Sequence, residues 1–329
     1  MTTNKHILFT GAGFSKNFGL PLAKEVWGVL FNNIKVKNDK VLNQLFHDEQ
    51  NYEIIYDFIR REHPKKLLII NQLLQNLFCS MDDIFINYIT NNKNSFQTNS
   101  FYEFLNRFSL PSSQYHNDYA SIFTLNQDLI VERFLRTRSE HILLITPSVT
   151  AISHRQPNQN ITISTRYSDL NEIYIQDNQP SEKPSVTSYI NYVKLHGSFN
   201  WKRKVGDSHE EILLIGKNKI NDIEDDNLLK KYFDIFENSL KKANKVLCVG
   251  YSFNDKHVNS LFVKYNIELH VLNPSPPDTF INFIANDKDE DKKTIWKHRI
   301  TNYYQGDLHS LFSDDHSTYN DLKSNYFDL

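Results

Sequence analysis

Two polar side chains near the middle of the chain have the types and spacing for chemistry on a bound ligand. Asn126 and Asp128, in the stretch Thr124-Leu-Asn-Gln-Asp128, are an amide and a carboxylate two residues apart. Because they follow an apolar run, both can reach into a crevice at the end of a strand. Alternatively, they cap the helix that follows, since Asn and Asp at a helix start accept hydrogen bonds from its free N–H groups.

A histidine follows another apolar run. His196 lies in Lys194-Leu-His-Gly-Ser198, beside Gly197. In that position it can be open to a cleft and act as a base near neutral pH. A lone histidine can equally be a hydrogen-bonded turn residue, and the pattern by itself leaves both roles open.

A glycine-rich stretch near the N-terminus has the features of a phosphate-binding turn. The apolar residues 7–10 precede Gly11-Ala12-Gly13-Phe14-Ser15, and a helical pattern opens at Pro21 and Leu22. Glycine lets the backbone turn sharply and approach a ligand. Free N–H groups at a helix start favour an anion such as a pyrophosphate. A tight turn without a ligand is the alternative, because the third glycine does not have the spacing of the common G-x-G-x-x-G fingerprint.

Two more stretches follow apolar runs in the second half of the chain. Gly250-Tyr251-Ser252 offers a second anion-binding turn, or a plain turn between a strand and a helix that Asn254 or Asp255 caps. Asn273 could bind a ribose hydroxyl or start the turn before Pro274.

Strands that alternate with helices must position these residues. Residues 126–136 and 227–243 have helical periodicity, and the first of these helices is expected to turn Glu132 and Arg133 outward. The alternation predicts an α/β fold with a doubly wound, Rossmann-like parallel sheet, which binds ligands at the carboxyl ends of its strands. Apolar runs typical of buried strands occupy residues 7–10, 119–124, 142–145, 192–195, 212–215, 245–249, 267–272 and 299–304.

Two long segments interrupt this alternation. Residues 35–116 have apolar residues recurring every three or four positions and predict a helical module inserted between the first two strands of the sheet. Residues 147–188 are polar and predict a long excursion with short antiparallel strands at 161–164 and 172–175.

Composition excludes several classes of protein. The chain has 329 residues, of which 40% are hydrophobic, so it can form one large or two modest domains. A net charge of -2 gives no general reason to expect nucleic acid or an anionic membrane as partner. No apolar run approaches the roughly 18 residues of a membrane span and the start is not a signal peptide, so we expect a cytoplasmic protein. Cys79 and Cys248 are expected in the core, and two cysteines cannot form a four-cysteine zinc site.

The order and spacing of the motifs resemble the sirtuin (silent information regulator) family. Gly-Ala-Gly-Phe-Ser, Thr-x-Asn-x-Asp, Leu-His-Gly-Ser, Gly-Tyr-Ser and a strand ending in Asn follow one another in that order. More closely, the chain is similar to prokaryotic sirtuin-like NADases of antiphage defence, in which Gly-Tyr-Ser-Phe-x-Asp is a familiar fourth motif. The resemblance spans about residues 6–315.

The resemblance implies a catalytic set of Asn126, Asp128 and His196. Asn126 would orient the ribose and the attacking water, Asp128 would lie near the nicotinamide carboxamide, and His196 would act on the ribose hydroxyls. For NAD binding it implies that the diphosphate contacts Ala12, Gly13 and Ser15, with further phosphate contacts from Gly250 and Ser252. The other residues expected at the NAD site are Asn273 at the adenosine ribose, Asp307 near adenine, and Gly11, Phe14, Thr124, Gly197, Ser198 and Tyr251.

Two departures from the sirtuin sequence pattern favour NAD+ hydrolysis over protein deacylation. Deacylating sirtuins have Gly-Ile-Pro-Asp-Phe-Arg where this chain has Gly19-Leu-Pro-Leu-Ala-Lys24, and the zinc ribbon that shapes their acyl-peptide groove is missing. We therefore expect an NAD+ hydrolase that releases nicotinamide and ADP-ribose, in antiphage defence by NAD depletion, without a metal. An NAD or ADP-ribose sensor without turnover and an NAD-dependent protein deacylase are the alternatives.

The predicted organisation places regulation outside the sheet. Residues 1–34 and 117–315 form the predicted catalytic domain, residues 35–116 the helical module, and residues 316–329 a polar tail. An unrestrained NADase would drain its own cell, so we expect control by a homo-oligomer or a defence-system partner; the resemblance makes a HerA-like ATPase a candidate. The aromatic residues of the module either form that contact surface or pack inward; they are Phe46, Tyr52, Tyr56, Phe78, Phe85 and Tyr88.

Overall fold

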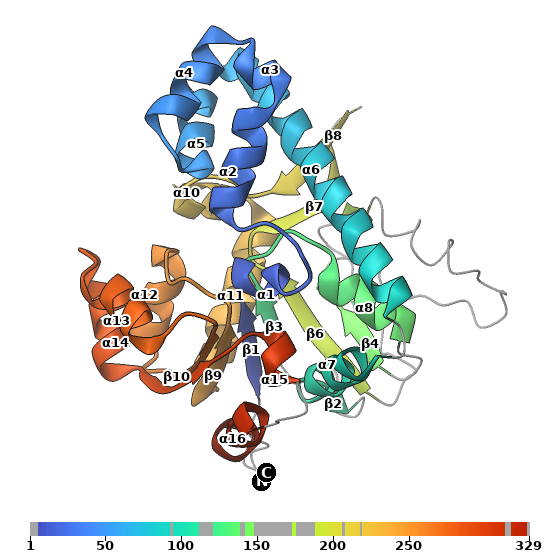
Figure 1. Ribbon diagram of the computed structural model, residues 1–329, viewed down its shortest axis with the longest axis vertical. Coiled ribbons are helices and arrows are strands. Elements are labelled where there is room, and N and C mark those ends of the chain that lie inside the picture. Colours follow the sequence, from blue (N-terminus) through green and yellow to red (C-terminus); the bar gives the residue numbers. More distant parts are fainter. Residues whose placement is uncertain are drawn as a thin grey trace, which may run out of the picture.

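A mainly parallel sheet of eight strands forms the centre of the molecule (Figure 1). The computed structural model describes residues 6–92, 95–111, 121–138, 142–147, 173–175, 188–205, 208–217, 219–312 and 317–327. The strand order is β11-β10-β9-β1-β3-β6-β2, and β4 also pairs with β6. Among the described residues of this sheet, only the β2–β6 pairing is antiparallel. The strands are β1 (Ile7–Thr10), β2 (Leu110–Pro111), β3 (Ile122–Thr124), β4 (Ile142–Ile145), β6 (Ser188–Lys194), β9 (Lys245–Val249), β10 (Glu268–Asn273) and β11 (Ile300–Gln305).

The topology confirms the predicted α/β fold and marks where a ligand would bind. From β1 the chain builds β3 and β6 on one side, then crosses to build β9, β10 and β11 on the other side. The order reverses between β1 and β9, and open parallel sheets bind ligands outside the carboxyl ends of the strands at such a point. The loops after β1 and β9 are the two glycine motifs, which border this point.

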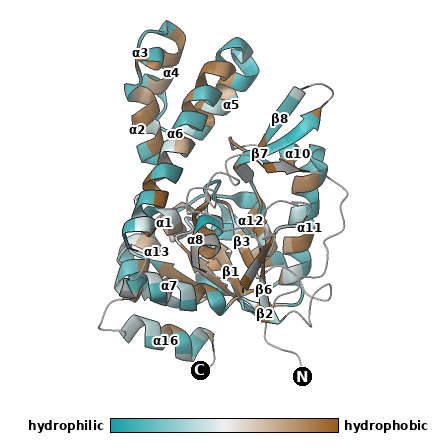
Figure 2. Cartoon of the chain, turned by 90° about the vertical axis from the view of Figure 1, so that its right-hand side faces the viewer, coloured by the Kyte–Doolittle hydropathy of each residue, from teal (hydrophilic) through white to brown (hydrophobic). Residues whose placement is uncertain are grey.

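The central strands are continuous runs of buried, mainly apolar residues, so side chains on both faces of the sheet pack against helices. The Phe9 ring packs against Phe236 of α11 (Asn227–Leu240) and Phe262 of α12 (Lys256–Lys264), each with ring centroids 5.5 Å apart. Elsewhere Phe101 of α7 (Phe96–Asn106) contacts Phe134 of α8 (Ile130–Arg138) at 4.6 Å. Figure 2 shows hydrophobic colour on the central strands, and both hydrophobic and hydrophilic colour on the surrounding helices.

A small second sheet continues from the main one. Strand β7 (Gly197–Val205) begins two residues after β6 and pairs with β8 (Ser208–Leu213) and β5 (Ile173–Ile175). The strand predicted at residues 172–175 exists as β5, but it pairs parallel to β7 and not antiparallel as predicted. The strand predicted at 161–164 lies outside the described residues. The strand predicted at 212–215 begins earlier, because it pairs along the edge of β7.

The described segment between β1 and β3 is helical as predicted, apart from the short strand β2, which lies inside the predicted helical module and pairs with β6. Helices α2 to α5 form a group at one end of the molecule, and the long α6 runs from that group down to α8 (Figure 1). Helix α2 packs against α3, α4 and α5, whereas α7 packs against α8 at the sheet. The division of the chain into domains stays a prediction. The helices are α2 (Ala23–Asn32), α3 (Ile34–Lys37), α4 (Lys40–Asp48), α5 (Tyr52–Glu62) and α6 (Pro64–Asn91).

Aromatic residues of this segment pack inward. Phe18, in the loop after β1, contacts Phe85 at 5.3 Å and Tyr88 at 5.7 Å, and Phe78 stacks on Phe199 at 5.8 Å. The structure thus favours the second of the two predicted roles, because these rings supply core rather than a contact surface.

Helix α8 differs from its prediction in start and orientation. It begins at Ile130, so Asn126 and Asp128 lie in a loop before it. Glu132 and Arg133 were expected to point outward, but they are 1% and 0% exposed. Arg133 pairs with Asp82 of α6 and Glu132 with Lys194 of β6, since a buried charge is stable only with a partner.

The C-terminal residues pack on the sheet rather than forming a polar tail. Helix α16 (Ser317–Tyr326) follows α15 (Leu308–Leu311) and lies at the opposite end from the α2–α5 group (Figure 2). The buried Tyr326 hydroxyl accepts a 2.9 Å hydrogen bond from the Ile7 N–H and donates a 2.7 Å bond to the Ile7 carbonyl. The start of β1 is therefore held by the end of the chain.

The remaining features complete the outer layer. Helix α10 (Lys219–Asp225) packs on α11, while α14 (Glu290–His298) packs on β11 and α13 (Pro277–Ala285) packs on α14. Cys248 is buried as expected, but Cys79 is exposed, because it lies on the outer face of α6. Among the described helices, none has both the length and the apolar character needed to cross a membrane.

Candidate functional site

Parallel register brings the predicted motifs to one edge of the sheet. Thr10 pairs with Thr124 and with Val249, Thr124 pairs with Lys194, and Asn273 pairs with Gln305. Each of these residues ends its strand, and the predicted site residues follow in the adjoining loops. Asn126 and His196 each come two residues after the Thr124–Lys194 pair, so they follow two adjacent strands at the same edge of the sheet.

Asn126 is fixed by its amide nitrogen. The Nδ2 group donates to the Gly11 carbonyl at 2.9 Å and to Ser15 Oγ at 2.8 Å, and a carbonyl can only accept, so the orientation of the amide is set. The backbone N–H of Asn126 donates to Thr124 Oγ1 at 3.0 Å. Within the described part of the chain, the amide oxygen accepts no hydrogen bond. Asn126 therefore joins the loops after β1 and β3 and keeps one oriented acceptor.

Asp128 uses both carboxylate oxygens inside the protein. Oδ2 accepts a very short hydrogen bond from Ser15 Oγ, and Oδ1 accepts from the Ile130 N–H at 3.1 Å. The second bond is the helix-capping role that the sequence left open. Ser15, which is 4% exposed, thus lies between Asn126 and Asp128 and holds their loop against α1 (Ala12–Lys16).

The two glycine motifs pack against each other. The Gly13 N–H donates to the Gly250 carbonyl at 2.9 Å, and a Cβ on Gly250 would lie 2.1 Å from the Phe14 nitrogen. Gly250 also has a φ of 61°, which disfavours any residue with a side chain. The glycines are therefore required by the contact between the loops, a reason that differs from the predicted close approach to a ligand.

His196 occupies the short turn between the two sheets. It is the last residue before β7, its carbonyl accepts a 2.9 Å hydrogen bond from the Leu214 N–H, and it is 3% exposed. Gly197 has a φ of 71°, and a Cβ there would lie 2.1 Å from the Ile212 carbonyl oxygen. Only glycine allows the turn to press this closely on β8, which fixes the histidine before it.

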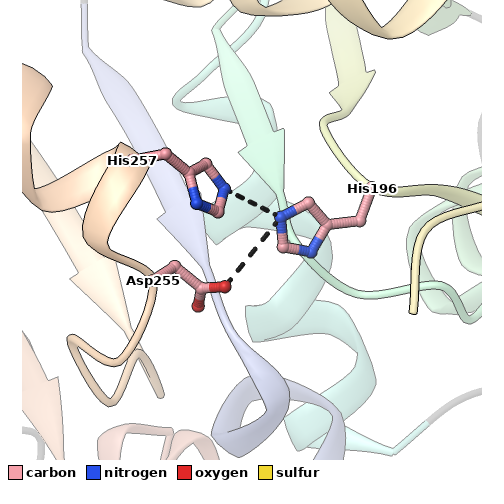
Figure 3. A group of neighbouring side chains, drawn as sticks. All are labelled: His196, Asp255 and His257. Carbon is pink, nitrogen blue, oxygen red and sulfur yellow. Dashed lines mark hydrogen bonds and ion pairs between the residues drawn. The ribbon is translucent and has the colours of Figure 1, made fainter. Parts of the chain in front are cut away.

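A second histidine and a carboxylate meet His196 (Figure 3). His196 Nε2 lies 3.1 Å from His257 Nε2 and 4.0 Å from Asp255 Oδ1. Asp255 starts α12 without capping it through its side chain; instead, its Oδ1 accepts a 3.0 Å hydrogen bond from Lys219. Lys219, which is 6% exposed, also donates to Glu53 of α5 at 3.2 Å.

This environment keeps both imidazoles neutral near pH 7. Burial lowers the pKa of His196 well below its usual range, and the Lys219 ammonium and His257 lower it further. Burial also lowers the pKa of His257 to about 4, with Asp255 opposing and Lys219 adding to the shift. For Lys219, burial opposes the charged form, but Asp255 and Glu53 raise its pKa overall. A neutral imidazole is the form that can accept a proton.

The same three side chains have ligand atoms within 4.8 Å of one another, a spacing that a metal ion can use. Sequence spacing alone did not predict such a cluster, because His196 comes from a different element. However, Lys219 already supplies a cation to the Asp255 oxygen, and a metal ion there would be repelled by the ammonium. The donor set fits a hydrogen-bonded pair of histidines better than a metal centre.

A family model described as a SIR2-like domain matches residues 120–304, more than half of the chain. The chain belongs to the SIR2-like family. No curated protein matches it. The predicted sirtuin-like family is therefore confirmed. SIR2-like domains use NAD+, which places the chain in the general class of NAD-dependent enzymes. The match begins after the first glycine motif, yet β1 lies between β3 and β9 in the centre of the same sheet.

Several predicted NAD-site residues of this SIR2-like domain lie in its interior. Phe14, Tyr251 and Ser198 are 1%, 2% and 0% exposed, and Thr124 is hydrogen-bonded to Thr10 at 2.7 Å. Their side chains support the loops. Tyr251, for example, donates to Asn259, which in turn donates to the Phe253 carbonyl and holds the loop after β9.

Other predicted residues remain at the edge of the SIR2-like sheet. Ala12 and Ser252 are exposed, and Gly13 and Gly250 are partly exposed. Asn273 accepts the Ser275 N–H at 2.9 Å, and Asp307 caps α15 through the Ser310 N–H at 2.7 Å. Asn273 therefore has the role of a turn residue and Asp307 the role of a helix cap.

Sequence reasoning missed His257 and Lys219 and considered Asp255 only as a cap. The signal was present in Asp255-Lys-His257, which begins three residues after Ser252 of the glycine motif. Lys219 gave no signal, because a lysine on a polar helix is ordinarily solvated and only the fold buries this one against Asp255.

Proposed function

We propose that this SIR2-like chain hydrolyses NAD+ to nicotinamide and ADP-ribose. The observation that carries the proposal is the oriented amide of Asn126, whose nitrogen is held by Gly11 and Ser15 while its oxygen is left as an acceptor at the carboxyl edge of the sheet. An acceptor fixed in this way can orient a water molecule or a ribose hydroxyl without rearranging during the reaction.

The reaction requires a water molecule and a site that tolerates positive charge on the ribose. The bond between ribose C1′ and the nicotinamide nitrogen breaks, and its electron pair neutralises the positive ring. The water oxygen bonds to C1′ and one proton is released, so NAD+ and water give nicotinamide, ADP-ribose and H+. Asn126 would orient the water, and the leaving group needs little acid assistance because it already carries positive charge.

His196 is suited to accept a proton from a ribose hydroxyl. It is neutral near pH 7 because burial and Lys219 lower its pKa, and it follows β6, the strand that pairs with the β3 strand before Asn126. An alkoxide-like hydroxyl next to C1′ would stabilise the positive charge that develops there. Asp128 is assigned a positioning role, since both its oxygens are engaged by Ser15 and Ile130.

The loops after β1 and β9 are proposed to hold the diphosphate. Ala12 and Ser252 are exposed at the point where the strand order reverses, and Gly13 and Gly250 lie between them. The contact between Gly13 and Gly250 fixes the two loops before a ligand arrives. Asn273 and Asp307, at the ends of β10 and β11, extend the same edge toward the adenosine half.

Product analysis tests the proposal against its two alternatives. The protein is incubated with NAD+ alone and with NAD+ plus an acetyl-lysine peptide, and the products are separated by liquid chromatography. We expect nicotinamide and ADP-ribose in both mixtures. Acetyl-ADP-ribose only with peptide would identify a deacylase, and NAD+ binding without nicotinamide in either mixture would identify a sensor; either outcome contradicts hydrolysis.

We also propose that antiphage defence by NAD depletion is the context, with activity controlled by a homo-oligomer or by a partner such as a HerA-like ATPase. The supporting feature is a set of exposed apolar side chains on the helices between β1 and β3, which are Leu22, Val29, Ile34, Leu68 and Ile84. Light scattering and NAD+ turnover across a dilution series test this. A monomer with full, concentration-independent activity and no response to the partner would contradict it.

A further inference from the structure

Resting on the proposed hydrolysis, we propose that His257 is a positioning residue that fixes the tautomer and ring orientation of His196. The predicted catalytic set contains one histidine, His196, yet the fold places a second imidazole in direct contact with it.

The distance between the His196 and His257 rings fits a hydrogen bond, in which one proton lies between the two nitrogens. Their Nε2 atoms are 3.1 Å apart, with ring centroids 5.4 Å apart and planes inclined by 42°. A hydrogen bond between them needs one protonated and one unprotonated Nε2. Asp255 Oδ1, which also accepts a hydrogen bond from Lys219, lies 4.0 Å from His196 Nε2, and we place the shared proton on this nitrogen.

The consequence is a defined base. With its proton on Nε2 and donated to His257, His196 presents an unprotonated Nδ1, and this nitrogen points away from His257 and Asp255 (Figure 3). A neutral histidine can exist as either tautomer, and only one of them has its acceptor on that side. His257 would thus decide which nitrogen of His196 can take a proton from substrate.

His257 is itself held by several elements. Its ring lies 5.3 Å from the Phe233 ring of α11, and Asp255 precedes it at the start of α12. The charged groups that face the pair are Asp255, Lys219 of α10 and Glu53 of α5. Because Lys219 binds both carboxylates, neither can move toward the histidines without losing its partner.

Two substitutions separate a positioning role from simple packing. His257→Phe keeps the ring volume and removes the nitrogen, whereas His257→Gln keeps a side-chain amide that can accept a hydrogen bond near the Nε2 position. We expect kcat for nicotinamide release to fall at least about 10-fold in His257→Phe with KM within about twofold, and His257→Gln to recover most of the loss. A purely packing role would leave His257→Phe the more active of the two.

A readout independent of turnover keeps this inference separate from the proposed function. Two-dimensional NMR of protein labelled with 15N-histidine reports the tautomer of each ring. We expect His196 protonated on Nε2 in the wild type and in His257→Gln, and a mixture of tautomers in His257→Phe. An unchanged His196 tautomer in a folded His257→Phe overturns the proposal, as does a stoichiometric metal ion bound to the wild type. If the tautomers behave as expected but no NAD+ is cleaved, the hydrolysis fails and the positioning stands.

Discussion

The backbone N–H of Gly13 donates a 2.9 Å hydrogen bond to the carbonyl of Gly250, so the loop after the first strand is joined to the loop after β9. The contact is close enough that neither glycine has room for a Cβ: one on Gly13 would lie 2.7 Å from Gly250 Cα. The two motifs that border the reversal of strand order therefore form one rigid unit, and the proposed diphosphate site is built on their joint surface.

Gly250→Ala should destabilise the fold. Its Cβ would lie 2.1 Å from the Phe14 nitrogen, and its φ of 61° costs a residue with a side chain about 1–2 kcal/mol before any clash is counted. We expect a loss of at least about 2 kcal/mol in the free energy of unfolding, measured with urea. Gly28→Ala is the control: a Cβ in this helical position meets nothing within 4 Å, so it should stabilise by about 0.5–1 kcal/mol. Equal effects of the two changes would contradict the packing account.

The sequence predicted the parallel sheet and the edge at which its motifs meet, because apolar runs and the residues that end them are local signals. It did not predict the five-residue helix α1, which contains Gly13 and has no periodicity to detect. It also predicted, wrongly, that Glu132 and Arg133 are exposed to solvent, because their partners Lys194 and Asp82 come from other elements. Likewise, the pairing of His196 with His257 depends on α12 packing beside the turn after β6, which no spacing in the chain encodes.

The buried pair of Lys194 and Glu132 should be costly to break. Both side chains are at most 1% exposed, and Nζ and Oε1 lie 2.9 Å apart. We expect Lys194→Met to lower the free energy of unfolding by about 3–5 kcal/mol, because it leaves a buried carboxylate without its partner. Adding Glu132→Leu should restore part of that loss.

The control for this pair is Lys293→Met. Lys293 pairs with Glu290, whose side chain is 81% exposed, and an exposed pair contributes at most about 1 kcal/mol. A loss for Lys194→Met no larger than for Lys293→Met, or a double variant less stable than Lys194→Met alone, would show that Lys194 and Glu132 do not compensate each other.

Acid should weaken the fold through His257. Its pKa is about 4 in the folded protein and about 6.5 when unfolded, so the unfolded state binds more protons between these values and stability falls as pH falls through that window. From pH 7 to pH 5 this residue should account for a loss of about 2 kcal/mol. The measurement is urea unfolding of wild type and His257→Gln at both pH values. A stability difference that does not depend on pH would contradict the lowered pKa.

Removal of metal should leave activity unchanged. The Asp255 oxygen that would bind an ion is hydrogen-bonded to Lys219 at 3.0 Å, so the positive charge of the site is already supplied by the chain. Dialysis against a chelator should not alter nicotinamide release or the melting temperature. Activity that disappears on dialysis and returns with zinc or magnesium would instead assign His196, Asp255 and His257 as ligands.

The central claim is that Asn126 directs water to NAD+, and the most direct measurement compares nicotinamide release by wild type and Asn126→Ala at matched NAD+ occupancy. Calorimetry sets the NAD+ concentration for equal occupancy, and circular dichroism checks that the variant is folded. We predict that the wild type releases nicotinamide and that the variant binds NAD+ but is at least about 100-fold slower, because it has lost the oriented amide oxygen. Equal rates in the two proteins, or no release by the wild type at full occupancy, would contradict the account.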